Sequence, residues 1–484
     1  MNSMLSRRRA LRSSGLMLAA LGASSTGLGL LLRPAFAQEA RLTFNDQTAV
    51  AVTIYNENLA LVKDRRNAPL VQGLNNIAFI DVSGQMRPET ALLHAEGEKL
   101  TLLEQNFEFD LLTHEKLLEK SVGQTVTVIK TNPATGAETV EEAKVLSVAG
   151  GLVLRIGDRI ETQYPGRVVF DRIPPELRAR PTLVLSVDSP FAALRLVELS
   201  YLTGGLAWKA DYVAELAADE KTVDLSGWVT LTNTSGTFYR NAKLQLVAGE
   251  VNQVQPMMEK EMRTMAMADA AAPAPAMAEE ALFEYHLYTL SRPTTIADNQ
   301  TKQVALLSGS GVPVRKELRF VNISQAYNYP MAEQPRVNAT VRLMFDNKEQ
   351  DKLGMPLPMG IVRVYKNDSS GQALFVGEDR IAHTPKGETV KLALGQAFDV
   401  TAQPKQTEFE QLSDRVFEAA FEIEIKNAKK EAVTVRIDEN IPGMWEILSE
   451  SHPHEKVDAF QAGWNVEVPA EGASTLKYKV RVKF

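Results

Sequence analysis

The chain has 484 residues, of which 53 are Lys or Arg, 60 are Asp or Glu and none is Cys. The lack of cysteine excludes disulfides, thiolate metal sites, iron–sulfur clusters and cysteine nucleophiles. A formal net charge of −7 argues against a general nucleic-acid-binding protein, which needs a basic face. The length predicts several folding units.

The first 37 residues have the arrangement of an export signal. A basic run with Arg7-Arg8 precedes an apolar stretch, and Ala35 and Ala37 supply the small residues that a signal peptidase requires. Glycines dilute the apolar stretch, which favours the twin-arginine route. We therefore expect residues 1–37 to be a twin-arginine signal peptide and the mature chain to be periplasmic, without a transmembrane segment. An uncleaved membrane anchor is the alternative.

Short strands are predicted from residue 49 onward. Val50, Val52 and Ile54 alternate with smaller or polar residues, so residues 38–109 are expected to form an N-terminal β-region. Leucine spacing over residues 110–120 predicts one short helix, which Gly123 ends. Short strands on tight turns follow, and they predict a small β-barrel-like module over residues 110–172.

The central part of the chain is predicted to be a β-sandwich in two pieces. The first piece covers residues 173–251 and the second covers residues 283–405. Residues 252–282 between them are rich in Met, Ala and Pro and lack the apolar stripe of a docked helix. This composition predicts a mobile linker.

Some positions in the sandwich suggest specific structural roles. The Gly204-Gly205 pair predicts a tight bend, and Trp208 and Tyr212 should point to the same face of one strand. Residues 233–236 have the composition of a hairpin turn. Phe398 is expected to be a core aromatic residue.

Regular alternation is clearest at the C-terminus. Each strand there has one apolar and one charged face, as a sandwich requires. The apolar positions are Phe421, Ile423, Ile425, Val433, Val435, Ile437, Trp464, Val466, Val468, Leu476, Tyr478, Val480 and Val482. We expect residues 406–484 to form an immunoglobulin-like sandwich without a disulfide, and the whole chain to be all-β and multi-domain.

Several separated motifs occur in a recognisable order. They cover residues 198–212, 227–236, 241–249, 360–365, 375–379 and 394–399. Together they resemble the bacterial domain-of-unknown-function family that includes the mucoidy-inhibitor-A-like proteins. The resemblance implies an extracytoplasmic β-sandwich protein. It assigns no catalytic residue, and Thr237-Phe238-Tyr239 stand where many relatives carry two acidic residues and Trp.

Two groups of side chains are candidate metal ligands. Thioethers are soft ligands for Cu(I), and five methionines crowd the predicted linker: Met257, Met258, Met262, Met265 and Met267. The same segment also suits a linker or a docking segment for a partner's groove. His452 and His454 lie close to Glu455, and the three could meet one cation, although a polar loop explains them equally well.

Charged residues suggest two further hypotheses. A glycosidase needs two facing carboxylates. Glu378-Asp379 and Asp438-Glu439 are adjacent pairs, but neighbours on a strand point to opposite faces. Alternate residues of the last strand form a basic stripe of Lys477, Lys479, Arg481 and Lys483. This stripe predicts a solvated face opposite Glu422 and Glu424, or contact with anionic envelope polymers.

These patterns favour a non-catalytic periplasmic protein that binds or scaffolds in the cell envelope, with no cofactor. Its expected partner is an envelope protein or polysaccharide, and no nucleic acid. A hydrolase acting on envelope polysaccharide and a Met-rich copper-binding protein are the alternatives.

Overall fold

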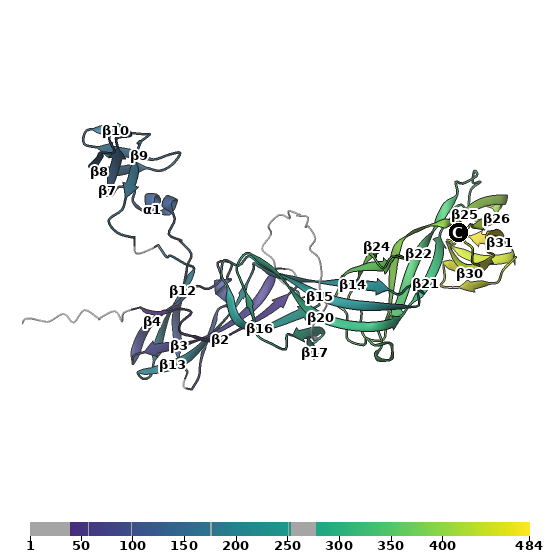
Figure 1. The fold of residues 1–484 in the computed structure, drawn as a ribbon, viewed down its shortest axis with the longest axis horizontal. Helices are drawn as coiled ribbons and strands as arrows, with labels where there is room; N and C mark the ends of the chain where they lie inside the picture. Colours follow the sequence, from purple (N-terminus) through teal and green to yellow (C-terminus); the bar gives the residue numbers. More distant parts are fainter. Residues whose placement is uncertain (1–38, 57, 98, 175–176, 250, 253–276) are drawn as a thin grey trace, which may run out of the picture. The chain divides into compact units, whose positions relative to one another are not determined.

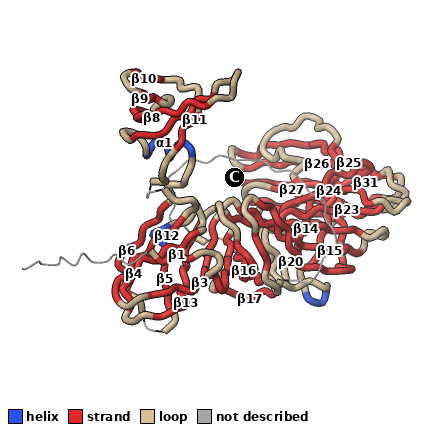
Figure 2. The backbone as a smooth tube through the Cα atoms, turned by 60° about the vertical axis from the view of Figure 1, so that its left-hand side comes forward, coloured by secondary structure: helices blue, strands red, loops and turns tan. Residues whose placement is uncertain are grey.

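The structure of the protein is a computed structural model that describes residues 39–56, 58–97, 99–174, 177–249, 251–252 and 277–484. Strands dominate the described residues (Figure 2), so the expected all-β fold class is confirmed. The helical elements in this part are α1 (His114–Lys120) and two 3-10 turns, Pro88–Thr90 and Glu349–Asp351. None of them is long and apolar enough to cross a membrane. The predicted signal peptide, residues 1–37, lies outside the described residues.

Two sheets combine strands from the predicted N-terminal region with later strands (Figure 1). The first has the order β1 (Ala40–Leu42), β4 (Gly73–Ile80), β12 (Thr182–Ser189) and β6 (Thr101–Glu108). The second has the order β17 (Ala278–Leu282), β18 (Tyr285–Thr289), β16 (Tyr239–Ala248), β2 (Gln47–Tyr55), β3 (Leu59–Leu70), β13 (Ala193–Thr203) and β5 (Leu92–Ala95), and β19 (Thr294–Ile296) pairs with β16. Strand β17 covers the last residues of the segment that was predicted to be a linker, 252–282.

The predicted barrel-like module is an open sheet. Its order is β10 (Arg159–Glu161), β9 (Val153–Ile156), β8 (Glu138–Ser147), β7 (Thr125–Thr131) and β11 (Arg167–Val169). Among the described residues β10 and β11 are not paired, so the barrel is not closed. The sheet is short, with a small core of Val126, Val128, Ala143, Val145, Leu154 and Ile156.

The predicted helix is present but begins later than expected. The side chain of Thr113 caps it by accepting a hydrogen bond from the amide of Lys116 at 3.2 Å. Residues 110–112 stay outside because the amide of Leu112 bonds to the carbonyl of Arg178 instead. Gly123, at φ +83°, follows the helix as predicted.

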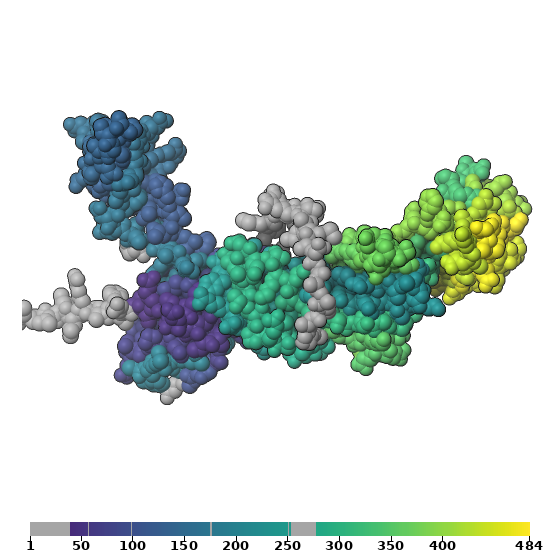
Figure 3. Space-filling model, viewed as in Figure 1, coloured from purple at the N-terminus to yellow at the C-terminus, as the bar shows by residue number. Residues whose placement is uncertain are grey.

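A central sheet has the order β20 (Gln300–Pro313), β15 (Thr222–Asn233), β14 (Leu206–Leu216), β23 (Gly360–Asn367) and β24 (Ala373–Ile381). Strands β14 and β23 pair in parallel although they are far apart in the sequence. In Figure 3 their teal and green residues adjoin accordingly. The side chains of Trp208 and Tyr212 are both buried on β14, as the two-residue period predicts.

The C-terminal part forms a nine-stranded sheet. Its order is β28 (Met444–Glu450), β31 (Gly472–Lys483), β26 (Val416–Asn427), β25 (Thr389–Ser413), β22 (Val337–Asp346), β21 (Arg315–Val321), β27 (Val433–Asn440), β30 (Gln461–Val468) and β29 (His454–Lys456). Strands β30 and β31 are not hydrogen-bonded neighbours, yet Trp464 stacks on Tyr478 with ring centroids 4.7 Å apart. The two arms of the sheet therefore face each other across a core, as in a sandwich.

Strands β22 and β25 each contribute to two hydrophobic cores. Leu343 of β22 and Leu392 of β25 belong to the large core that also contains residues of the N-terminal and central sheets. Ala339 of β22 and Val400 of β25 belong to the core of the nine-stranded sheet. The boundary expected between residues 405 and 406 falls inside β25.

Two predictions about individual positions are wrong. Residues 233–236 do not close a hairpin, because β15 and β16, which they connect, belong to different sheets. Phe398 is not a core residue: it is 90% exposed, since Ala397 and Val400 of β25 are the positions that face the core. Register shifts between β22 and β25 interrupt the alternation just before this point.

Candidate binding site at the nine-stranded sheet

Strand β27 carries the two adjacent carboxylates that the sequence singled out. Asp438 and Glu439 are both fully buried, and they lie on opposite faces of the strand as expected. The inward alternation of Val435 and Ile437 continues to Glu439, so this carboxyl group occupies a core position. The two residues therefore take part in separate networks, one on each face.

Asp438 on the outer face lies between two arginines. Its carboxylate pairs with the guanidinium of Arg319 on β21 and with Arg436 Nε at 2.8 Å. Arg319 Nη1 also lies 3.9 Å from Glu317, and Arg436 Nη1 lies 2.9 Å from Glu455. Arg319 Nε is buried and has no hydrogen-bond partner among the described residues. A buried donor left unpaired costs stability.

Glu439 on the inner face holds the segment that follows β21. Its Oε1 accepts hydrogen bonds from the amides of Ile323 (3.2 Å) and Ser324 (3.1 Å) and from Ser324 Oγ (3.1 Å). Its Oε2 accepts from the hydroxyl of Tyr327 at 3.3 Å, and that hydroxyl contacts the hydroxyl of Tyr478 at 3.2 Å. Successive backbone amides aimed at one carboxylate form an anion-binding concavity.

Burial and hydrogen bonding act against each other on this carboxyl group. Desolvation disfavours the charged form and raises the pKa, while the donors of Ser324, Ile323 and Tyr327 lower it. Burial is the larger effect and raises the pKa of Glu439 to about 7. Glu439 therefore titrates near neutral pH.

The segment that Glu439 holds also lines a pocket. The cavity has a volume of about 320 Å³, within the lower range of small-molecule sites. Asn322 and Gln325, which flank the amides bonded to Glu439, both have left-handed backbone conformations with φ of 52° and 53°. The lining residues are Arg319, Phe320, Val321, Asn322, Ile323, Gln325, Gln334, Pro335, Val337, Asn338, Thr340 and Pro404.

The lining is rich in uncharged hydrogen-bonding groups. The side chains of Asn322, Gln325 and Thr340 make no hydrogen bond to any described residue, so their donors and acceptors remain available. Asn338 donates from Nδ2 to the carbonyl of Ala397 at 2.7 Å, which leaves its side-chain oxygen free to accept. Sequence reasoning missed this site because no periodic pattern marks residues 322–336. The continued alternation from Val435 to Glu439 is the signal that points to it.

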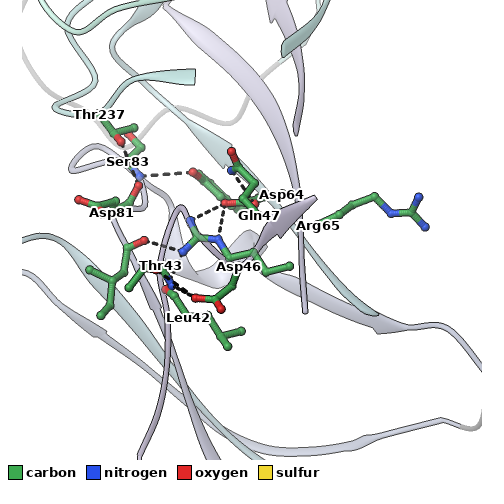
Figure 4. A network of polar contacts seen from close by, with 12 residues as sticks. Leu42, Thr43, Asp46, Gln47, Asp64, Arg65, Asp81, Ser83 and Thr237 are labelled. Carbon is green, nitrogen blue, oxygen red and sulfur yellow. Dashed lines mark hydrogen bonds and ion pairs between the residues drawn. The ribbon is translucent and has the colours of Figure 1, made fainter. Parts of the chain in front are cut away.

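A second buried charge, Arg66, has a structural role by contrast. Its guanidinium is fully buried; Nε and Nη2 donate to Asp64, at 3.1 and 2.7 Å, and Nη1 donates to the carbonyls of Leu42 and Ile80. Gln47 donates to the other oxygen of Asp64 at 2.9 Å (Figure 4). These groups are fully occupied, and we assign them to the packing of the N-terminal sheets.

The candidate metal ligands are placed separately. His454 Nδ1 lies 2.9 Å from Glu450 and its ring contacts Trp445 and Trp464, whereas His452 Nδ1 contacts Ser451. Glu455 pairs with Arg436 instead of joining the histidines. Within the described residues no group of three or more His, Asp or Glu is placed to hold a metal ion. The candidate copper ligands Met257, Met258, Met262, Met265 and Met267 lie outside the described residues.

The other charged candidates are paired with side chains or backbone amides of the same or a neighbouring sheet. Glu378 pairs with Arg363 at 3.1 Å, and Asp379 accepts a hydrogen bond from the amide of Ala393. In the basic stripe, Lys477 pairs with Glu422 at 2.6 Å, opposite it on β26 as expected. Lys479 and Arg481 both pair with Glu418. Cross-strand pairing of this kind is typical of a solvated sheet face.

Comparison with known proteins identifies a family for the greater part of the chain. The family model described as "Domain of unknown function (DUF4139)" matches residues 197–484, which contain the pocket, Glu439 and the motifs of the resemblance. No curated protein matches the chain. On this match, the chain belongs to the DUF4139 family of domains of unknown function.

Proposed function

We propose that this chain is a non-catalytic periplasmic protein that binds an envelope polysaccharide through the pocket beside Arg319. The observation that carries the proposal is the pocket's lining: the side chains of Asn322, Gln325 and Thr340 meet there without hydrogen-bond partners among the described residues. Such convergent polar groups on a preformed concavity favour a ligand site. The pocket lies in the family-matched region, and we further propose that the chain groups with the mucoidy-inhibitor-A-like proteins, on its ordered motifs.

A binding role fits the state of the carboxylates better than catalysis does. A general acid must reach the substrate, but Glu439 is fully buried on the inner face and bonded to Ser324 and Tyr327. Asp438 is engaged by Arg319 and Arg436. A polysaccharide hydrolase remains the alternative because the pKa of Glu439 near 7 suits a general acid. Release of reducing sugar that is lost in Glu439→Gln would favour the hydrolase.

Binding is tested by co-sedimentation of the purified chain with washed, insoluble envelope polymer from the same cells. We expect the wild-type chain to sediment with the polymer. Thr340→Val, which removes the hydroxyl but keeps the shape of the side chain, should remain largely in the supernatant. Gln372→Ala, an exposed amide that does not line the pocket, is the matched control. Equal sedimentation of wild type and Thr340→Val would contradict the proposal.

The periplasmic location is tested by fractionating cells that express the chain with a C-terminal tag. The double substitution Arg7→Lys and Arg8→Lys should leave the chain in the cytoplasm, because the twin-arginine pathway requires the arginine pair. Arg12→Lys changes a neighbouring basic residue and should be exported like the wild type. Identical distribution of all three chains would contradict a twin-arginine signal.

Copper binding that disappears on deletion of residues 257–267 would favour the Met-rich alternative.

A further inference from the structure

We infer that the pocket beside Arg319 binds a neutral saccharide unit, an inference that rests on the proposed binding function and specifies its ligand class. Four properties of the site decide the class: the hydrogen-bonding groups, the charge balance, the pairing of the strands beneath it and the apolar part of its lining.

The available groups match the hydroxyls of a sugar. The amides of Asn322 and Gln325 offer both donors and acceptors, and the hydroxyl of Thr340 can do either. Sugar hydroxyls also both donate and accept, so each can pair with any of these groups. Arg319 lines the same pocket, but its Nε is buried, so the amide and hydroxyl side chains are the groups that can pair with the ligand.

The charge balance disfavours an anionic ligand. Arg319 is the charged residue of the lining, and its guanidinium already pairs with Asp438 and lies near Glu317. With Arg436 and Glu455 included, the network holds two cations and three carboxylates. An acidic sugar or a phosphate would therefore meet a site with one more negative than positive charge. A neutral ligand avoids this repulsion.

The strands beneath the pocket disfavour an extended peptide. Peptides bind sheets mainly by pairing with a free strand edge. At the pocket, Arg319 of β21 is paired on both sides, with Thr340 of β22 and with Arg436 of β27. Beyond the pair of Arg319 and Thr340 the two strands separate: residues 320–321 pair only with β27, and residues 337–338 only with β25, among the described strands. These short facing edges leave no room for the several residues of an added strand, so side chains must recognise the ligand.

The apolar part of the lining suits the carbon face of a sugar ring. Ile323, Pro335 and Val337 lie at the pocket with Pro404, which is buried. The volume of about 320 Å³ matches a small ligand or one unit of a polymer rather than a folded partner.

The test is ligand-observed NMR titration of the purified full-length chain. The neutral probes are the methyl glycosides of glucose, galactose and N-acetylglucosamine, and the comparison probes are glucuronic acid and tetra-alanine. We expect at least one neutral glycoside to bind. Thr340→Val and Gln325→Ala should each raise its Kd about tenfold, the effect of one lost hydrogen bond of roughly 1.4 kcal/mol. Gln372→Ala should leave the Kd unchanged.

Stronger binding of glucuronic acid or tetra-alanine than of every neutral glycoside would overturn the inference, as would binding of no neutral glycoside. Co-sedimentation with envelope polymer distinguishes a wrong ligand class from a wrong proposed function. If no glycoside binds but Thr340→Val still releases the chain from the polymer, the ligand class is wrong and the binding function stands. If the Thr340→Val chain sediments with the polymer as the wild-type chain does, the proposed function itself is wrong.

Discussion

The carboxyl group of Glu439 is protonated more readily in the folded chain than in the unfolded chain. Its ordinary pKa is 4.5 and its folded pKa is about 7. Between these values the folded state holds a proton that the unfolded state has released, so rising pH lowers the free energy of unfolding. The expected loss from this residue between pH 4.5 and pH 8 is on the order of 3 kcal/mol.

Urea denaturation at pH 5, 6, 7 and 8 tests this prediction. Glu439→Gln cannot ionise, so its stability should rise relative to that of the wild type as the pH increases. Glu446→Gln, an exposed glutamate on β28 of the same sheet, is the control and should follow the wild type. Parallel profiles of wild type and Glu439→Gln would show that Glu439 does not titrate in this range.

The buried ion pair of Arg66 and Asp64 should respond strongly to loss of one partner. Arg66→Met leaves the carboxylate of Asp64 buried without its cation, which costs about 3–5 kcal/mol of stability. Arg65, the next residue, is half-buried and pairs with Glu96 and Glu198 near the surface. Arg65→Met should therefore cost less than about 1 kcal/mol. Chemical denaturation measures both, and equal losses would contradict a structural role for Arg66.

At the scale of elements, two chain crossings between the second sheet and the central sheet pack against each other. Residues 204–205 connect β13 to β14, and residues 234–238 connect β15 to β16. Gly205 has φ +76°, and a Cβ there would lie 2.5 Å from the Cα of Ser235. The amide of Thr234 also donates to the carbonyl of Gly205 at 2.6 Å. The crossings therefore require a residue without a side chain at position 205.

Gly205→Ala should lower stability by about 3 kcal/mol or more, because it adds a backbone clash to the strain of positive φ. Gly371→Ala is the matched control: its φ is +84°, but a Cβ there has open space. Gly371→Ala should lose only the stability that comes from the strain of positive φ, about 1 kcal/mol. Thermal unfolding of the two variants compares them directly, and equal destabilisation would mean that the crossings tolerate a side chain.

At the scale of the molecule, β22 and β25 join two cores into one cooperative structure. Leu392 lies in the large core and Ile423 in the core of the nine-stranded sheet, and β25 contributes to both cores. Leu392→Ala and Ile423→Ala should each cost about 2–5 kcal/mol and shift the same calorimetric transition. Two transitions that respond separately to the two substitutions would show that the cores unfold independently.

The period-two pattern predicted much of the C-terminal core from the sequence. Ile423, Ile437, Trp464 and Val480 are all buried as expected, since their strands have one dry and one wet face. The pattern alone does not predict the order of the strands in a sheet. Residues 233–236 are therefore predicted as a hairpin turn, whereas in the structure the chain crosses there from one sheet to another. Phe398 was misplaced because register shifts beside it change which positions face inward.

The candidate site was only partly predictable. Alternation predicts that Asp438 and Glu439 lie on opposite faces of their strand, and their separate partners, Arg319 and Ser324, confirm this. Their partners Arg319 and Tyr327 lie more than a hundred residues earlier, and only the parallel pairing of β21 with β27 brings them together. The pocket itself depends on residues 322–336, which follow no regular period.

The most direct test of the account is hydrogen–deuterium exchange of the full-length chain with and without the methyl glycoside that binds most tightly. The account predicts slower exchange in the peptides that cover residues 319–340 and unchanged exchange in β24, Ala373–Ile381. Slower exchange confined to other segments, or none at the pocket under saturating glycoside, would contradict the claim that the chain binds its ligand there.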